Sequence, residues 1–379
     1  MGLISFVRIK YAINTMENLL YPIALTLVPG VGPITARNLI SYCGGAAAVF
    51  ESSRKALRKI PGIGEHVVSA ILETDVLPAA EREIEFLEKR GIQAFTYLDK
   101  NYPARLKHYP DSPLVLFYNG TADLNAERIV GIVGTRQPTP TGITLCEEVV
   151  EALAPYKVLV ASGLAYGIDA TAHRKSVDCG LDTVAVVGHG LQMVYPAAHR
   201  SLAKRICEQG GMLSEYTHTT MPDREHFPMR NRIIAAMCDA LIVVETATQG
   251  GSIITAHLAN QYNKDVFAIP GRPKDKYSQG CNQLIKNNQA VLAESAEDVV
   301  KIMGWELDKP QIPVQAQMFQ ELNPAEQKVV DILQQIEEVS IDRLTYEAQL
   351  TPGQMAGLLL GLEFKGVVRP LPGKRYMLA

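Results

Sequence analysis

The sequence predicts an α/β protein with a mostly parallel, doubly wound sheet, a small all-helical domain before it and a winged-helix domain after it. Short apolar runs alternate with helix-length segments through the middle of the 379-residue chain. A repeated Pro-Gly-x-Gly pattern precedes this region, and a pattern of three helices and a β-hairpin follows it. The chain length fits about two to three domains.

The middle region carries the predicted sheet, which we place in an extended Rossmann-like domain over residues 127–304. Its candidate strands are nearly continuous apolar runs rich in Val and Ile, at 128–134, 157–162, 182–188, 211–216, 240–246 and 265–271. Such runs are typical of strands buried on both faces of a parallel sheet. Candidate helices lie between them, at 142–154, 168–179, 198–209, 229–238 and 252–262. In sheets of this type, ligands bind at the carboxyl ends of the strands.

Residues 16–75 contain two near-copies of one motif, at 27–40 and 59–72, and resemble a helix-hairpin-helix pair. Backbone amides at the start of each following helix can hold a nucleic-acid phosphate without a basic side chain. The glycines that form the two turns are Gly30, Gly32, Gly62 and Gly64. Few Lys or Arg residues flank them, which favours a purely structural hairpin over a DNA contact.

Residues 323–379 predict a winged helix, with helices at 324–335, 340–348 and 352–365 and a hairpin at 367–378. The only base of the third helix is Lys365, which disfavours direct reading of a major groove. A protein contact and a weak DNA contact through Arg369, Lys374 and Arg375 remain open alternatives.

The remaining segments connect these domains. We expect residues 76–126 to lead into the sheet domain and the Pro- and Gln-containing residues 305–322 to form an extended linker. Residues 1–15 are expected to be a disordered extension or an annotation artefact, so Met1 and Met16 are both candidate starts.

Composition excludes several classes of protein. The formal net charge is −3, so the chain does not coat a polyanion through bulk positive charge. The six cysteines form no C-x-x-C pair, which argues against a zinc ribbon and fits a reducing cytoplasm. The apolar stretch 19–28 contains Pro22 and is too short for a membrane span. We expect no metal, no cofactor and no membrane contact.

Glycines, hydroxyls and arginines gather in the loops that follow the predicted strands. Glycine allows a close backbone approach to a ligand, and helix N-termini offer free amides. The sequence therefore predicts a phosphate-binding rim without an evident nucleophile. Its candidate residues are Gly134, Thr135, Arg136, Ser162, Gly163, Phe227, Arg230, Asn231, Arg232, Gly250, Gly251 and Ser252.

Two of these arginines, Arg230 and Arg232, cannot face the same way on a helix. We expect one to pair with a buried carboxylate such as Glu215 or Glu245 and the other to face the ligand, and the sequence leaves open which does which.

Other polar residues favour structural roles. A dinucleotide fold needs G-x-G-x-x-G after its first strand and an acid ending its second, and both are missing. Asp169 is expected to cap a helix, and the separated His173, His189 and His199 are expected to be structural.

Seven ordered motifs together resemble the DNA-processing protein A (DprA/Smf) family. They read VGTRQPTPTG, SGLAYGIDATAHR, VYPAAH, SEY, FPMRNRIIA, QGGSIITA and IPGRP. The resemblance implies a homodimer, formed through the Rossmann-like domains, that binds single-stranded DNA. It also implies a non-enzymatic mediator that receives and protects incoming strands in natural transformation and helps to load the RecA recombinase. This chain departs from the usual motifs at Thr135 (usually Ser), Tyr166 (usually Arg) and Gly250 (usually Ser).

Two alternatives remain open. Phosphoribohydrolases that act on nucleoside monophosphates share a related fold, but carry a PGGxGT loop with a nearby Glu. This chain has TATQGGSI, with Glu245 five residues before Gly250. An adaptor whose Rossmann-like domain contacts only protein is the other alternative.

Overall fold

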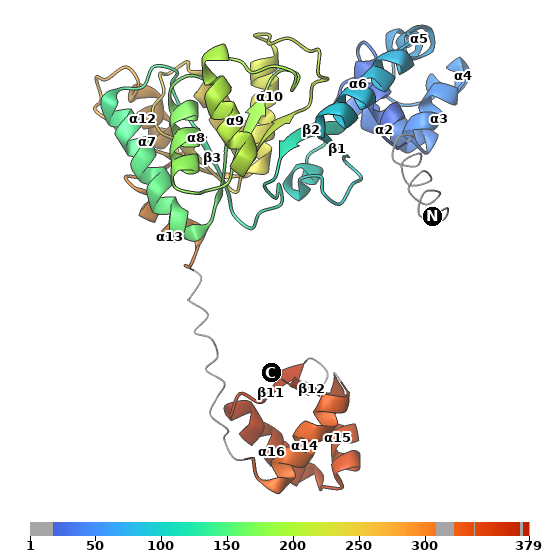
Figure 1. The fold of residues 1–379 in the computed structure, drawn as a ribbon, viewed down its shortest axis with the longest axis vertical. Helices are drawn as coiled ribbons and strands as arrows, with labels where there is room; N and C mark the ends of the chain where they lie inside the picture. The colour runs from blue at the N-terminus through green and yellow to red at the C-terminus, as the bar shows by residue number, and fades with distance from the viewer. Residues whose placement is uncertain (1–17, 308–321, 337, 372–373, 379) are drawn as a thin grey trace. The chain divides into compact units, whose positions relative to one another are not determined.

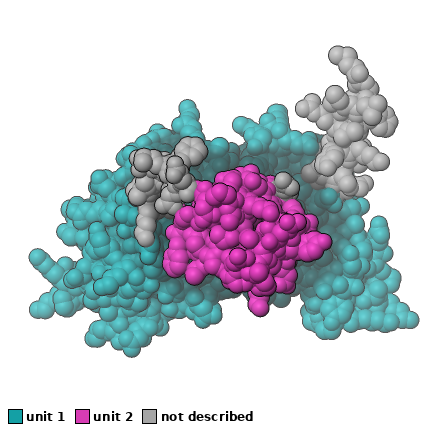
Figure 2. Space-filling view, turned by 90° about the horizontal axis from the view of Figure 1, so that it is seen from below, with its two compact units in different colours: residues 1–307 teal, residues 308–379 magenta. Residues whose placement is uncertain are grey.

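The structure, a computed structural model, describes residues 18–307, 322–336, 338–371 and 374–378. It divides into two compact units, 1–307 and 308–379, which Figure 2 distinguishes by colour. The expectations for residues 1–15 and for most of the linker at 305–322 lie outside the described residues.

The larger unit is built on one nine-stranded sheet, drawn in Figure 1. Its strands are β1 (Gln93–Thr96), β2 (Val115–Gly120), β3 (Ile129–Val133), β4 (Leu159–Ser162), β5 (Thr183–Val187), β6 (Gly211–Ser214), β7 (Ala240–Val243), β8 (Asp265–Ala268) and β9 (Val291–Leu292). The order is β1-β2-β6-β5-β4-β3-β7-β8-β9. Strands β3 to β9 pair in parallel, and β1 and β2 add two antiparallel strands at one edge. The predicted mostly parallel sheet is confirmed.

Helices cover both faces of this sheet, as a doubly wound fold requires. They are α7 (Pro140–Leu153), α8 (Ile168–Asp178), α9 (Arg200–Gln209), α10 (His226–Met237), α11 (Gly251–Gln261), α12 (Gln279–Lys286) and α13 (Ala296–Met303). Within β3, Val130 and Ile132 pack with α7, α8 and α13, whereas Ile129 and Val133 pack with α10, α11 and α12. Successive residues thus alternate between two apolar cores, and nearly continuous apolar runs are the result.

The strand order reverses between β3 and β7. From β3 the chain adds β4, β5 and β6 on one side, and then returns to add β7, β8 and β9 on the other. The loops that leave β3 and β7 therefore diverge, which opens a crevice at the carboxyl end of the sheet.

The small helical domain comprises the helical residues 18–27 and the helices α2 (Pro33–Cys43), α3 (Ala46–Glu51), α4 (Arg54–Leu57), α5 (Glu65–Glu73) and α6 (Leu77–Arg90). Gly30 and Gly62 adopt left-handed φ angles of 78° and 81°, which side-chain-bearing residues rarely adopt. The helical core is continuous with β2 through Val115 and Phe117. The backbone N–H of His218 also donates to Glu83 of α6, so the helical domain is tied to the sheet domain.

The smaller unit is a winged helix, as predicted. Its elements are α14 (Pro324–Gln335), β10 (Val339–Ser340), α15 (Ile341–Ala348), α16 (Pro352–Phe364), β11 (Val368–Leu371) and β12 (Arg375–Leu378). Asn323 and Thr351 cap α14 and α16 by accepting backbone N–H groups. Lys365, the single base that the sequence places on the third helix, is the C-cap of α16 and donates to Glu326 at 2.8 Å, so it is already paired.

Three buried histidines make hydrogen-bonding contacts within the fold. The Nδ1 atoms of His173, His189 and His199 lie within 2.7–2.9 Å of Thr183 Oγ1, Gly190 O and Leu164 O, respectively. Burial, reinforced by the positive charge of Arg230, lowers the pKa of His173 from 6.5 to about 3.

The depressed pKa of His173 predicts a loss of stability in acid. The unfolded chain takes up a proton near pH 6.5, whereas the folded chain does so only near pH 3. The contribution of His173 to the free energy of unfolding is therefore fully present above pH 6.5. Between pH 6.5 and pH 3 it falls by about 1.4 kcal/mol for each unit by which the pH drops. Urea unfolding between pH 7 and 5 should show a smaller pH dependence for His173→Gln than for the wild type. Equal slopes for the two proteins would contradict this origin.

Candidate nucleic-acid interface

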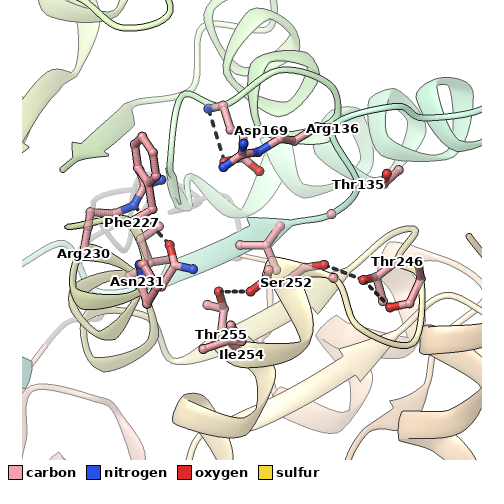
Figure 3. A pocket seen from close by; sticks show the side chains of 18 of the residues that line it. Thr135, Arg136, Asp169, Phe227, Arg230, Asn231, Thr246, Ser252, Ile254 and Thr255 are labelled. Atoms are coloured by element: carbon pink, nitrogen blue, oxygen red, sulfur yellow. Dashed lines mark hydrogen bonds between the residues drawn. The ribbon is translucent and has the colours of Figure 1, made fainter. Parts of the chain in front are cut away.

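A cavity of about 760 Å³ lies in the crevice where the strand order reverses. Figure 3 shows that its walls come from the loop after β3, the start of α10 and the start of α11. The residues predicted from sequence that line it are Gly134, Thr135, Arg136, Phe227, Arg230, Asn231, Gly250, Gly251 and Ser252. Loops from distant parts of the chain thus converge as the sheet topology requires.

Backbone hydrogen bonds hold the loop after β3 in place. The N–H of Thr135 donates to Glu245 O, and Thr135 O accepts the N–H of Ile168 at 3.2 Å. A Cβ on Gly134 would lie only 2.5 Å from Ile168, so glycine permits this close approach of β3 to α8. Arg136 is exposed, and its guanidinium carbon lies 5.5 Å from the centre of the Phe227 ring. The loop therefore presents one cation above an aromatic ring.

The start of α11 forms the opposite wall. Gly250 is its N-cap, no side chain caps the helix, and its first turn has no acidic residue. The hydroxyl of Ser252 donates to Thr246 Oγ1 at 2.7 Å, which orders the turn. Uncapped amides at a helix N-terminus favour a bound anion such as a phosphate.

The cavity's exposed charge is positive. Arg136, Arg224 and Lys276 line it and are exposed, and no ion pair among the described residues involves them. The acidic residue on the lining is Asp169, which is buried and accepts the N–H of Ala165 at 3.4 Å. Burial raises the pKa of Asp169, and the positive charge of Arg230 opposes that rise.

The expected division between the two arginines is partly confirmed. Arg232 pairs with Glu215 in the interior, and both side chains are almost fully buried. Arg232 therefore lies outside the lining of this cavity, which corrects its place among the candidate ligand contacts.

Arg230 lines the cavity, but its guanidinium is buried. It donates to Gly163 O at 2.5 Å and also to Val186 O, so it ties the loop after β4 to β5. Burial lowers its pKa to about 10, so it remains charged at neutral pH. Arg230 therefore holds the wall of the cavity and adds positive potential from behind it.

Ser162 and Gly163 also lie outside this lining. Ser162 is fully buried, and its hydroxyl donates to Ile132 O at 2.6 Å across the sheet. Gly163 borders a smaller neighbouring hollow. A hydroxyl on the last residue of a strand can point into the sheet as readily as toward a ligand, and loop position alone does not distinguish them.

Several lining residues were not predicted. Arg224, Lys276 and Tyr277 lie in loops that the sequence places at the same edge, and the positive charges of Arg224 and Lys276 were the available signal. Tyr277 donates its hydroxyl to Gln137 at 2.7 Å, which brings the loop after β8 against the loop after β3.

Glu245 is the acid that a phosphoribohydrolase would need near its glycine loop, but here it makes structural hydrogen bonds. Its two oxygens accept the N–H and the hydroxyl of Thr139, at 2.9 and 2.6 Å. The residue as a whole is only 8% exposed. Glu245 therefore holds Thr139, which is the N-cap residue of α7.

The two hairpins of the helical domain differ in how well their backbone amides suit a phosphate. At the second hairpin, Glu65 follows Gly64 in the first turn of α5 and pairs with Arg54 and Arg58. That carboxylate opposes an anion at the same amides. The first hairpin, with Gly30 and Gly32, carries no acid in the first turn of α2.

Only part of the wing's positive charge is paired: Arg369 and Lys374 are exposed, and no ion pair among the described residues involves them. Arg375 pairs with Glu338 at 3.0 Å, and Lys374 occupies the turn before β12 with a φ of 58°.

The described residues contain neither a metal-binding cluster nor a membrane-spanning helix. No three His, Cys, Asp or Glu side chains there come together as metal ligands. None of the helices in these residues is both long and apolar enough to cross a bilayer.

Fold and site together define an α/β protein with an anion-receptive crevice at the strand-order reversal and two accessory helical domains. Comparison with known families makes this specific. Residues 93–304 match the family "DNA recombination-mediator protein A", residues 315–374 match "DprA winged helix domain", and residues 23–74 match "SAM-like Helix-hairpin-helix tandem". The chain belongs to the DNA recombination-mediator protein A family.

Individual relatives support this assignment. The Protein Smf of Synechocystis sp. is 31% identical over 94% of this chain and 98% of its own length. The DNA processing protein DprA of Streptococcus pneumoniae is 42% identical over 56% of this chain and 75% of its own.

Solved structures of the family are also similar. The X-ray structure of the Streptococcus pneumoniae protein matches with a TM-score of 0.63 at 32% identity, covering 74% of this chain and 95% of that one. The Helicobacter pylori protein, whose structure describes a single-stranded DNA binding mode, matches with a TM-score of 0.51 at 27% identity, covering 56% and 97%.

Proposed function

We propose that this chain is a single-stranded DNA-binding recombination mediator whose crevice holds the phosphates of the strand. One observation carries the proposal. Three exposed cations, Arg136, Arg224 and Lys276, line the same cavity as the uncapped start of α11. Phosphate contacts of this kind give affinity with little base preference.

Family membership supports the finer parts of the proposal. The protein protects incoming single strands, helps to load the RecA recombinase onto them in natural transformation, and acts in the cytoplasm as a homodimer formed through the Rossmann-like domain. Assembly of RecA filaments on strands already bound by this protein, compared with strands bound by an unrelated single-strand binder, tests the loading role. Sedimentation of the full chain tests the dimer.

The proposal predicts tight, salt-dependent binding to single strands. Anisotropy titrations of the full chain should favour a labelled single strand over the duplex of the same sequence. Three cations predict a slope of about −2 for log affinity against log salt, since each neutralised phosphate of a single strand contributes about −0.7. A flat salt dependence, or equal affinity for single strand and duplex, would contradict binding through the crevice.

A non-enzymatic role is part of the proposal. Glu245 is the acid nearest the glycine loop in sequence, and both of its carboxylate oxygens already accept hydrogen bonds from Thr139. Incubation with AMP should therefore release no free adenine, whereas release of adenine would favour the phosphoribohydrolase alternative.

A further inference from the structure

Aromatic side chains from three separate segments gather beside the crevice. Tyr166 lies in the loop between β4 and α8, Tyr195 lies between β5 and α9, and Phe227 lies in the first turn of α10. They border a small hollow together with Arg136 and Arg230, both of which also line the main cavity. The aromatic cluster and the phosphate-receptive crevice therefore share one wall.

The rings are ordered before any ligand arrives. The Tyr195 and Phe227 rings are nearly parallel, with centroids 6.0 Å apart and 22° between their planes. The guanidinium of Arg136 lies over the Phe227 ring, so Phe227 contacts both a cation and a second aromatic ring. Tyr166 packs edge-on against His199 with centroids 5.0 Å apart, and His199 is in turn held by Leu164 O. Preordered rings lose little conformational entropy on binding.

Two of these rings are unusually open to solvent. Tyr166 is 49% exposed and Tyr195 is 48% exposed. Within the described part of the chain, neither hydroxyl makes a hydrogen bond, so hydroxyl contacts do not explain the positions of these rings. Exposed aromatic faces beside a cationic crevice fit a ligand that is flat and apolar on its faces and anionic along its backbone. A nucleobase within a polynucleotide has this chemistry.

We propose that Tyr166 and Tyr195 form a base-stacking subsite for nucleotides adjacent to those whose phosphates lie in the crevice. This inference rests on the proposed single-strand binding. The hollow between the rings has a volume of only about 30 Å³, too small to admit a base. The bases therefore stack on the exposed outer faces of Tyr166 and Tyr195. Every base has a π face, so the subsite supplies affinity without sequence preference.

The test separates stacking of bases from contact with the backbone. Two labelled oligomers of equal length are titrated with the full chain at fixed salt, one of deoxythymidine and one in which every nucleotide is abasic. The wild type should prefer the thymidine oligomer. The double variant Tyr166→Ala, Tyr195→Ala should lose about tenfold or more in affinity for that oligomer, and less than about twofold for the abasic one.

Two further variants control for the loss of a ring and for altered folding. The double variant Tyr166→Phe, Tyr195→Phe keeps both rings and should bind the thymidine oligomer as the wild type does. Tyr42→Ala removes a ring of similar exposure, 60%, from α2 in the helical domain and should change neither affinity. Thermal unfolding of each variant shows whether the fold is intact.

The outcomes distinguish this subsite from the function on which it rests. Equal losses for the two oligomers in the alanine variant, or no loss for either, would overturn the stacking subsite while leaving single-strand binding in place. A phenylalanine variant that loses as much affinity as the alanine variant would overturn the subsite as well. A wild type that binds neither oligomer would overturn the proposed function itself.

Discussion

Replacing Arg232 by methionine is expected to lower the free energy of unfolding by about 3–5 kcal/mol, because it leaves a buried carboxylate without its partner. The Glu215 side chain is 12% exposed, and its second oxygen, Oε1, already has no hydrogen-bond partner. Burial raises the pKa of Glu215, and the charge of Arg232 opposes that rise. Without Arg232, the folded chain must hold an uncompensated charge or take up a proton.

Urea unfolding at pH 7 measures this loss, and two further variants test its cause. Adding Glu215→Gln to Arg232→Met removes the stranded charge, so the double variant should be more stable than Arg232→Met alone. Lys204→Met breaks an exposed pair with Glu208 at 4.0 Å and should cost no more than about 1 kcal/mol. If Arg232→Met kept its stability and lost single-strand binding, Arg232 would belong to the DNA contact after all.

The central strands are predictable because their physical cause is visible in the sequence. Burial on both faces demands an apolar side chain at nearly every position, as in β3 and β7. The two antiparallel strands, β1 and β2, follow that pattern less completely. β1 begins with an exposed residue and β2 ends in partly exposed Asn119 and Gly120, so neither stands out from the connector. They become strands by pairing with β6 and with each other.

The site is predictable to the level of its loops, and less so to the level of its side chains. Loops after parallel strands must meet at one edge, which is why Gly134, Arg136 and Gly251 do line one cavity. The direction of a side chain depends on packing that the sequence does not contain. Ser162 turns into the sheet for that reason, and Arg230 reaches back to Gly163 and Val186.

Replacing Arg136 by alanine is expected to weaken single-strand binding by about 1–3 kcal/mol, in the range for loss of a charge-assisted hydrogen bond. Arg136 combines three properties that no other arginine on the cavity has together. It lies in the loop that β3 presents, it is exposed, and it stacks over Phe227. Arg224 lacks the stacking partner, and Arg230 is buried.

Anisotropy titrations over a salt series separate the charge of Arg136 from other effects. Loss of one phosphate contact should reduce the magnitude of the salt slope by about 0.7. Stability should change little, because the guanidinium is exposed and makes no ion pair within the described residues. Arg174→Ala is the matched control, since it removes an exposed charge from α8 outside the cavity lining and should leave affinity unchanged. Equal losses from the two variants would mean that overall charge, rather than the crevice, attracts the strand.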